Sequence, residues 1–381
     1  MTKTYQEINE KIAKGEALVM TAEEVSRLAE TLSVEEIAEK VDVVTTATFG
    51  PMCSSGAFIN FGHPDPAMRM EKIFLNNVEA YAGIAAVDAY LGVTQESEKD
   101  LTYGGAHVIE ALIRGDKVEL VATAKGTDCY PRKKIRAMIS RETVNEMILH
   151  NPRNAYQNYP AATNSTQDKK YTYMGILKPE HGNVTYSTSG ELSPLLNDPF
   201  FRTIGIGTRI FLAGAQGYVT WNGTQFKSDS ERNEFGIPLL NAGTLTVTGD
   251  MKEMSTEFIR AAYYKKYGVS MFIGIGVPIP VLDADIARRV SIRNEQIETY
   301  IRDYGNPDHP ILAKANYKDL RSGKIEFNGK MVPTTAMSSL KKARKIADLL
   351  KEQVQKGEFF LTEPVQGFPE NKSLKNLKAI D

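Results

Sequence analysis

The sequence predicts an α/β protein, with a mixed, partly parallel sheet flanked by helices and a β-rich middle region or subdomain. Helix and strand patterns alternate as far as residue 124, which is typical of βαβ units. Residues 150–250 instead contain short β-branched runs and turn signals, and an amphipathic helical pattern returns at residues 339–356.

The length of the chain bounds its domain organisation. The 381 residues exceed the roughly 250–300 residues over which a single hydrophobic core usually grows. We therefore expect a domain over residues 1–368, built either as one body or as two lobes near 1–150 and 151–368. Residues 369–381 are mostly polar, and we expect them to form a flexible C-terminal tail.

The elements of the first third follow from capping signals and periodicity. Thr21–Glu24 and Ser33–Glu36 read as capping boxes, each of which predicts the start of a short helix. The segments after them predict a strand, two helices and a second strand, in the order 41–46, 66–78, 106–114 and 118–124.

The remaining elements are more strand-rich. Residues 151–168 lack periodicity and are expected to form a loop; the tyrosines of 151–173 are candidates to line a pocket, with surface tyrosines as the alternative. A helix is expected after Ser255, to include Phe258 and Tyr263. The other predicted elements are strands at 209–212, 218–221, 245–248 and 269–277, a hairpin at 324–332 and a helix at 339–356.

Composition excludes several classes of protein. Lys+Arg number 46 against 47 Asp+Glu, so the net charge gives no long-range attraction for nucleic acid or anionic membranes. Neither a secretory signal nor an apolar run of about 18 residues occurs. Two cysteines are few for a disulfide scaffold, the histidines lack zinc-site spacing, and nucleotide-binding fingerprints are missing. We expect a cytoplasmic protein without an intrinsic cofactor or metal.

Cys53 lies in a glycine-rich stretch that follows a predicted strand. Glycines such as Gly56 let backbone N–H groups approach a ligand, and Ser54 and Ser55 add hydroxyl donors, so these three residues are candidate substrate-binding groups. His63 is a candidate proton carrier. The alternative for the cysteine is an inert residue buried in a turn.

Cys129 also follows a predicted strand and lies beside basic residues. Arg132, Lys133 and Lys134 can stabilise a thiolate, and Arg132 or Lys133 can hold a substrate carboxylate. Asp128 opposes thiolate formation, and a basic run is often only a solvated surface. Because ligands gather beyond the carboxyl ends of parallel strands, the shared position of the two cysteines indicates a site there.

Four segments resemble the homocysteine biosynthesis family. The block Gly50–Ala57 is the most specific of the matching stretches, which are 45–63, 126–134, 205–217 and 281–298. The resemblance extends from about residue 5 to residue 368.

This resemblance implies the sulfurtransferase that converts L-aspartate semialdehyde to L-homocysteine, as described in anaerobes and methanogens. It also implies persulfide chemistry at two cysteines, which correspond to Cys53 and Cys129, with the latter essential. Members carry C-terminal regulatory CBS domains or act beside a small ferredoxin-like protein. We expect a short form without CBS domains that takes electrons from an external donor, such as a ferredoxin-like protein.

The chemistry leads to a hypothesis for each residue. Converting an aldehyde into a CH₂–SH group requires addition of sulfide, loss of water and two electrons. In this hypothesis Cys129 carries sulfur to the aldehyde, Cys53 resolves or relays it, Arg132 or Lys133 holds the carboxylate, and His63 moves protons. The order of the two cysteines, the sulfur donor and the oligomeric state, a homo-oligomer included, are left open.

Two alternatives compete with this interpretation. An acyl or CoA transferase would use an activated glutamate, for which Glu191 and Glu257 are candidates. A persulfide carrier would pass sulfur to a separate synthase and release no homocysteine itself.

Overall fold

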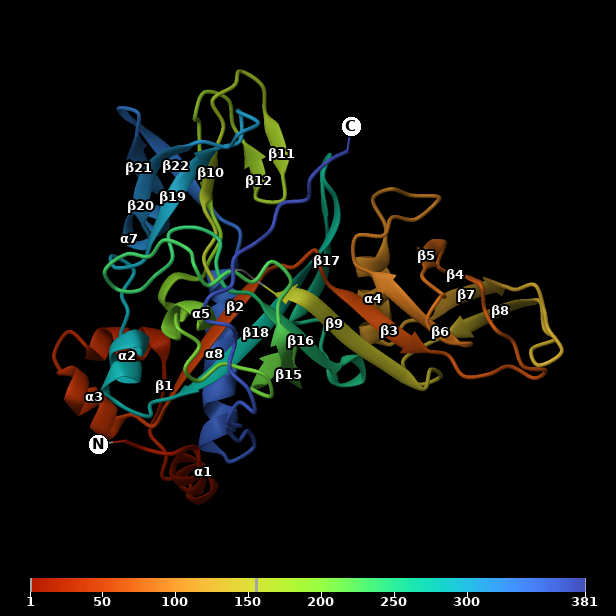
Figure 1. Ribbon diagram of the computed structural model, residues 1–381, viewed down its shortest axis with the longest axis horizontal. Helices are drawn as coiled ribbons and strands as arrows, with labels where there is room; N and C mark the ends of the chain where they lie inside the picture. The colour runs from red at the N-terminus through yellow and green to blue at the C-terminus, as the bar shows by residue number, and fades with distance from the viewer. Residues whose placement is uncertain (1, 155–156, 381) are drawn as a thin grey trace.

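The computed structural model describes residues 2–154 and 157–380. In this part of the chain the strands form sheets of ten, six, four and two strands. The ten-stranded sheet crosses the middle of the molecule, with the six-stranded sheet above its left end and the four-stranded sheet at its right end (Figure 1). The mixed α/β architecture confirms the predicted fold class.

The central sheet is antiparallel except where β1 pairs with β2. Its strands come from both sides of residue 150, so a division there would pass through one sheet. In spatial order they are β1 (Val19–Thr21), β2 (Val43–Pro51), β18 (Gly268–Pro280), β14 (Arg209–Leu212), β15 (Ala215–Asn222), β16 (Leu245–Asp250), β9 (Glu146–Asn154), β3 (Gly56–Asn60) and β6 (Asp88–Gly92), with β17 (Ile259–Tyr264) also paired to β18.

The strands β2 and β18 form the buried centre of this sheet. Residues of β2 are buried from Val43 to Gly50, as their β-branched sequence predicts. The helix α8 (Leu340–Gln355) packs on both strands. A Cβ atom at Gly274 would lie 2.6 Å from the side chain of Ile346, so glycine in β18 allows the helix to approach closely.

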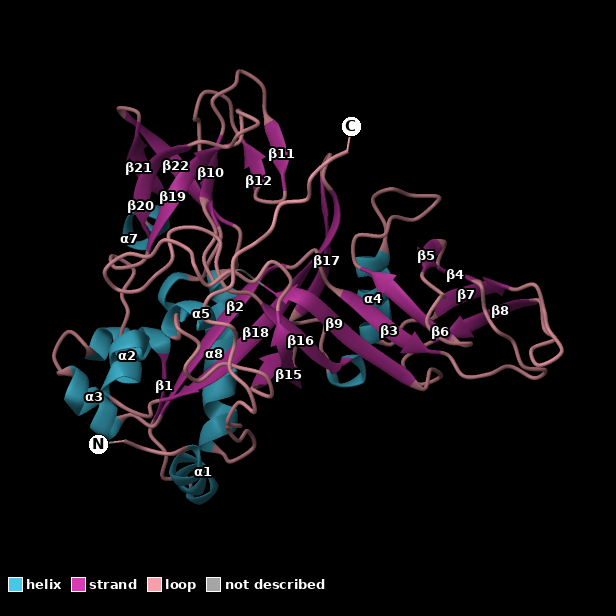
Figure 2. Cartoon of the chain, viewed as in Figure 1, coloured by secondary structure: helices cyan, strands magenta, loops and turns pink. Residues whose placement is uncertain are grey.

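The other helices gather mostly at the end of the central sheet that holds β1 (Figure 2). Both predicted capping boxes are present: the side chains of Thr21 and Ser33 accept hydrogen bonds from the backbone N–H groups of Glu24 and Glu36. The α-helices of the described residues besides α8 are α1 (Tyr5–Lys14), α2 (Ala22–Leu28), α3 (Val34–Lys40), α4 (Gly105–Arg114), α5 (Pro194–Asn197), α6 (Ala284–Val290) and α7 (Tyr317–Arg321). Short 3-10 turns lie at Gly190–Leu192 (η1) and Met251–Glu253 (η2).

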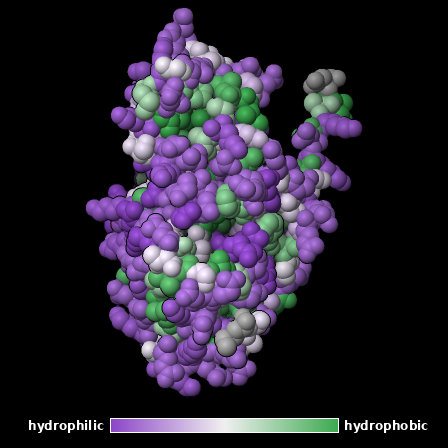
Figure 3. All heavy atoms as spheres, turned by 90° about the vertical axis from the view of Figure 1, so that its left-hand side faces the viewer, coloured by the Kyte–Doolittle hydropathy of each residue, from purple (hydrophilic) through white to green (hydrophobic). Residues whose placement is uncertain are grey.

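The six-stranded sheet has a separate hydrophobic core that includes the fully buried Tyr317 of α7. Two of its strand pairs, β10–β19 and β13–β22, are parallel. Hydrophobic side chains gather over the upper part of this end of the molecule, and Ile311, Leu312 and Met331 are among the exposed ones (Figure 3). Its order is β20 (Ile311–Asn316), β19 (Glu298–Asp303), β10 (Ala161–Thr163), β13 (Val184–Tyr186), β22 (Lys330–Ala336) and β21 (Lys324–Phe327).

Two smaller sheets complete the fold. The four-stranded sheet has the order β5 (Val78–Ala80), β4 (Lys72–Leu75), β7 (Val118–Thr123) and β8 (Lys134–Ile139), and the two-stranded sheet consists of β11 (Lys170–Thr172) and β12 (Gly175–Leu177). No helix in the described residues is both long enough and apolar enough to cross a membrane.

Three predicted elements are wrong. The helix expected at 66–78 is replaced by β4 and β5, because burial alternates along both strands and β4 pairs with β7 on one side and β5 on the other. The helix expected after Ser255 is β17, which pairs along β18. The loop expected at 151–168 contains the end of β9 and all of β10, and its residues 155–156 lie outside the described part.

Candidate active site

A cavity of about 310 Å³ lies where the chain passes from β2 to β3. Its walls combine one thiol, several hydroxyl and amide groups and apolar side chains. Among the described residues that line it, Arg153 alone carries a charge. The lining residues used below are Cys53, Ser54, Arg153, Asn154, Tyr159, Tyr173 and Tyr267.

Cys53 is held at the cavity by two hydroxyl groups from the neighbouring strand region. Its Sγ lies 3.0 Å from the Oγ of Ser270 on β18, and the Tyr267 hydroxyl donates to it at 3.5 Å. Ser270 is fully buried, and the pairing of β18 with β2 extends to Phe272 and Pro51, each two residues along the chain from a partner of this contact. Burial, and then the adjacent thiol, raises the pKa of Tyr267 above its usual value, which keeps this phenol a donor. Hydroxyl donors stabilise negative charge on sulfur.

Arg153, near the end of β9, brings a positive charge to the cavity. Within the described chain its side chain forms one hydrogen bond, from Nε to the Oγ of Ser54 at 3.3 Å, and no ion pair. Ser54 follows Cys53 directly, so the guanidinium and the thiol lie in the same part of the site. A guanidinium without a carboxylate partner is suited to a bidentate grip on a ligand carboxylate.

Asn154, the last residue of β9, also lines the cavity. It is 3% exposed, and its Oδ1 has no hydrogen-bond partner among the described residues. Buried polar atoms are nearly always hydrogen-bonded, so this unpaired oxygen is an exception in a residue that borders the cavity. An ammonium group next to a carboxylate would satisfy Arg153 and Asn154 together.

Cys129 lies elsewhere. It is exposed in the loop between β7 and β8, which forms the right-hand end of the molecule in Figure 1, and it does not line the cavity at Cys53. The ring of His63 stacks on the neighbouring Tyr130 with 5.8 Å between centroids. Arg132 donates to the backbone carbonyls of Asp65 and Pro66.

The structure thus divides the predicted site residues into two groups. His63, Arg132 and Lys133 accompany Cys129, whereas Ser54 accompanies Cys53 at the cavity.

The other two residues of the Cys53 stretch have local structural contacts. The Oγ of Ser55 donates to the carbonyl of Met52 at 2.9 Å. A Cβ atom at Gly56 would lie 2.3 Å from the Tyr90 hydroxyl and 2.8 Å from the carbonyl of Leu91, so the pairing of β3 with β6 requires glycine there. Neither residue lines the cavity.

The two glutamates of the transferase alternative are engaged in ion pairs. Glu191 lies 3.9 Å from Arg321 and accepts a hydrogen bond from Ser26. Glu257 accepts hydrogen bonds from Lys342 and Lys345 on α8. Neither carboxylate lines the cavity, so nothing in this geometry supports a glutamate nucleophile.

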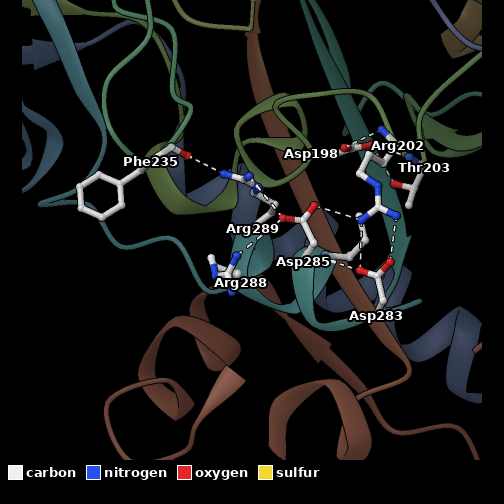
Figure 4. A network of polar contacts seen from close by, with 9 residues as sticks. Asp198, Arg202, Thr203, Phe235, Asp283, Asp285, Arg288 and Arg289 are labelled. Carbon is white, nitrogen blue, oxygen red and sulfur yellow. Dashed lines mark hydrogen bonds and ion pairs between the residues drawn. The ribbon is translucent and has the colours of Figure 1, made fainter. Parts of the chain in front are cut away.

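The segment 281–290 forms α6 and its N-terminal cap, and its carboxylates pair with an arginine from another part of the chain. Asp283 caps α6 by accepting from the N–H of Ile286, and it pairs with Arg202 through two hydrogen bonds of 2.8 and 3.1 Å (Figure 4). Arg202 also donates to Asp285 at 3.0 Å. These contacts fix α6 against the loop that follows α5.

Sequence reasoning missed most of the cavity wall. Arg153 and Asn154 come to this wall, and Ser270 comes to Cys53 behind it, through strands distant in sequence, and no local motif marks them. The tyrosine-rich composition of residues 151–173 was the available signal, and Tyr159 and Tyr173 do line the cavity.

Comparison with known proteins gives consistent matches. An L-aspartate semialdehyde sulfurtransferase of Methanocaldococcus jannaschii is 53% identical over 98% of this chain and 75% of its own length. A protein of the same name from Methanosarcina acetivorans is 51% identical over 99% of this chain and 74% of its own. An uncharacterized protein of Methanothermobacter thermautotrophicus is 27% identical over 85% of the chain and 73% of its own.

No solved structure matches significantly, so the family rests on sequence. The model of the family described as "Homocysteine biosynthesis enzyme, sulfur-incorporation" matches residues 17–361, which include Cys53, Cys129 and Arg153. The chain belongs to this family of sulfur-incorporating enzymes of homocysteine biosynthesis.

Proposed function

We propose that this enzyme transfers sulfur to L-aspartate semialdehyde to form L-homocysteine, and that the aldehyde reacts in the cavity at Cys53. The observation that carries the proposal is that a thiol held by two hydroxyls and an unpaired guanidinium line the same cavity. Two relatives with about half of their residues identical bear the name of this activity.

The substrate has three polar groups, and the cavity offers a partner for each. Arg153 binds the carboxylate, the Oδ1 of Asn154 accepts a hydrogen bond from the ammonium, and the aldehyde carbon faces Cys53. This replaces the hypothesis that Arg132 or Lys133 holds the carboxylate, because Arg132 already donates to two backbone carbonyls beside Cys129.

The positions of the cysteines favour the reverse of the roles hypothesised from sequence. Cys129 is exposed and accessible to a sulfur donor, whereas Cys53 lines the cavity that has room for a substrate. We assign the acquisition of sulfane sulfur, from a persulfide or polysulfide donor, to Cys129 and its delivery to the aldehyde to Cys53. Arg132 and Lys133 then stabilise the thiolate of Cys129, and His63 supplies protons there.

The electron balance requires an external reductant. Sulfide and the aldehyde give the thiol and one water on addition of two electrons and two protons. When the sulfur arrives as a persulfide, four electrons and four protons give the thiol, one water and the regenerated cysteine thiol. We propose a low-potential electron-transfer protein of the ferredoxin class as the donor, and the cytoplasm as the location.

The test is steady-state homocysteine formation from aspartate semialdehyde, polysulfide and a low-potential reductant under anaerobic conditions. Replacement of Arg153 by Gln removes a charged hydrogen-bond donor, so we expect KM for the aldehyde to rise about 10-fold to 100-fold. Arg260→Gln is the matched control, because Arg260 is an exposed residue of β17 outside the cavity. Failure of the wild-type enzyme to make homocysteine would overturn the proposal, and an unchanged KM in Arg153→Gln would overturn the substrate assignment.

A further inference from the structure

Three phenol hydroxyls meet at one wall of the cavity. The hydroxyl of Tyr173 is hydrogen-bonded to that of Tyr159 and lies 3.0 Å from that of Tyr304. Tyr159 and Tyr173 line the cavity, whereas Tyr304 lies behind them and stacks on His309 with 4.3 Å between ring centroids. The turn between these last two residues, 306–308, is exposed. The hydroxyls therefore form a series from the cavity to Tyr304, a residue that is half-buried.

This wall adjoins the sulfur atom. The ring of Tyr173 lies 5.7 Å from that of Tyr267, and the Tyr267 hydroxyl donates to the Sγ of Cys53. A small molecule that contacts the thiol therefore has the Tyr173 wall beside it. Arg153 approaches Cys53 from β9, through Ser54, so the charged group and the phenols belong to different elements.

The phenols are neutral donors at physiological pH. Burial, followed by the neighbouring Tyr159 and Tyr304, raises the pKa of Tyr173 well above its usual value. Burial likewise raises the pKa of Tyr304. A phenol with a raised pKa stays protonated at neutral pH, so it can donate a hydrogen bond to an oxygen atom of a ligand.

We propose that Tyr173 is a catalytic residue that donates a proton to the aldehyde oxygen when sulfur adds to the carbonyl carbon. The inference rests on the proposed function. In this step a bond forms from the sulfur held at Cys53 to the carbonyl carbon, and the carbon–oxygen π bond becomes an alkoxide. The alkoxide takes the Tyr173 proton, and Tyr173 regains a proton from solvent through Tyr304. No electrons enter or leave in this step.

The cluster also accounts for the later loss of water. The hydroxyl of the adduct leaves as water only after a second proton reaches it, and Tyr173 is then again protonated. Tyr159 supports the donor by sharing its hydrogen bond, so removal of the Tyr173 hydroxyl leaves two phenols that can still pair with each other. The Phe variant at position 173 is therefore expected to fold.

The experiment compares Tyr173→Phe with Tyr263→Phe, a control at an exposed residue of β17 outside the cavity. General acid catalysis contributes about 100-fold to 10,000-fold, so we expect Tyr173→Phe to lower kcat at least about 100-fold with KM changed less than about twofold. The control should retain the wild-type values. The mass of the sulfur-loaded Cys53 peptide should be unchanged in Tyr173→Phe, because loading precedes the step.

Three outcomes decide the inference. A kcat in Tyr173→Phe within threefold of the wild type overturns it, and so does a raised KM with normal kcat, which indicates binding alone. If Tyr173→Phe does not fold, Tyr304→Phe replaces it, with an expected loss in kcat because the proton return is interrupted; a normal kcat there overturns the inference. Absence of homocysteine from the wild-type enzyme is a different result, which refutes the proposed function instead.

Discussion

Cys53 and Cys129 differ in their surroundings more than in their sequence context. Cys53 lies against the buried Ser270 hydroxyl at 3.0 Å, whereas Cys129 is exposed in a loop among basic residues. A sulfur anion at Cys53 is thus stabilised by hydrogen bonds, and one at Cys129 by charge in contact with water. Only the second kind of stabilisation is visible in sequence, because the basic residues follow Cys129 directly and Ser270 is far from Cys53 along the chain.

The hydrogen bond between Ser270 and Cys53 leads to a prediction for thiol reactivity, because only the hydroxyl can donate once the sulfur is a thiolate. Ser270→Ala removes one donor to the Cys53 sulfur, so we expect Cys53 to react with iodoacetamide at pH 7 about threefold to tenfold more slowly. Peptide mass spectrometry reads both cysteines in one sample, and Cys129 serves as the internal control. An equal slowing at both cysteines, or none at Cys53, would contradict the proposed stabilisation.

At the scale of elements, helices with caps were predictable and strands inside mixed sheets were less so. Thr21 and Ser33 begin helices because their side chains bond local N–H groups, which requires no distant partner. The segment 66–78 has apolar residues whose spacing fits a helix as well as a strand. It forms strands because β4 pairs with β7, which is distant in the sequence. Arg153 was missed for the same reason, since its place beside Ser54 depends on sheet pairing.

An ion-pair cluster links α2 to α8 and α7. Glu23 accepts hydrogen bonds from Arg344 at 2.8 and 2.9 Å and from Arg321 at 3.4 Å. Burial acts to raise the pKa of Glu23, but the hydrogen bonds and charges of Arg344 and Arg321 outweigh it, so the pKa lies below its usual 4.5. A lowered folded-state pKa stabilises the protein above the unfolded value, and this stability is lost as pH falls through the folded value.

We therefore predict that Arg344→Gln lowers the free energy of unfolding at pH 7 by about 1–3 kcal/mol, less than for a fully buried pair because Arg344 is half exposed. The difference between variant and wild type should shrink as pH falls from about 4.5, the ordinary pKa of the unfolded group, through the lower folded-state pKa of Glu23. Urea denaturation at pH 7 and at a series of lower pH values measures this difference in the free energy of unfolding. A difference that stays constant with pH would show that the ion pair contributes nothing.

For the whole molecule, the main result is the placement of the two cysteines at different parts of the fold. Cys53 lies at the central sheet and Cys129 at the turn of the four-stranded sheet at one end (Figure 1). Both follow strands in the sequence, which predicted one shared site, but β2 and β7 belong to different sheets.

The whole-molecule topology was also the least predictable feature. The central sheet joins β1, β2 and β3 from the start of the chain to β9 and to β14–β18 from its middle. Such long-range pairing leaves no local signature, since it is decided by which buried faces fit together. The family resemblance supplied the activity, whereas the proposal that Arg153 and Asn154 bind the substrate came only from the three-dimensional arrangement.

The most direct test of the central claim, that sulfur reaches the substrate from Cys53, is a single turnover. Cys129→Ala and Cys53→Ala chains are loaded with labelled polysulfide, freed of donor, and mixed with aspartate semialdehyde and reductant. We predict labelled homocysteine from the Cys129→Ala chain, with loss of about 32 Da, one sulfur atom, from its Cys53 peptide. The loaded Cys53→Ala chain should release none. Labelled homocysteine from the Cys53→Ala chain, with none from Cys129→Ala, would contradict the account.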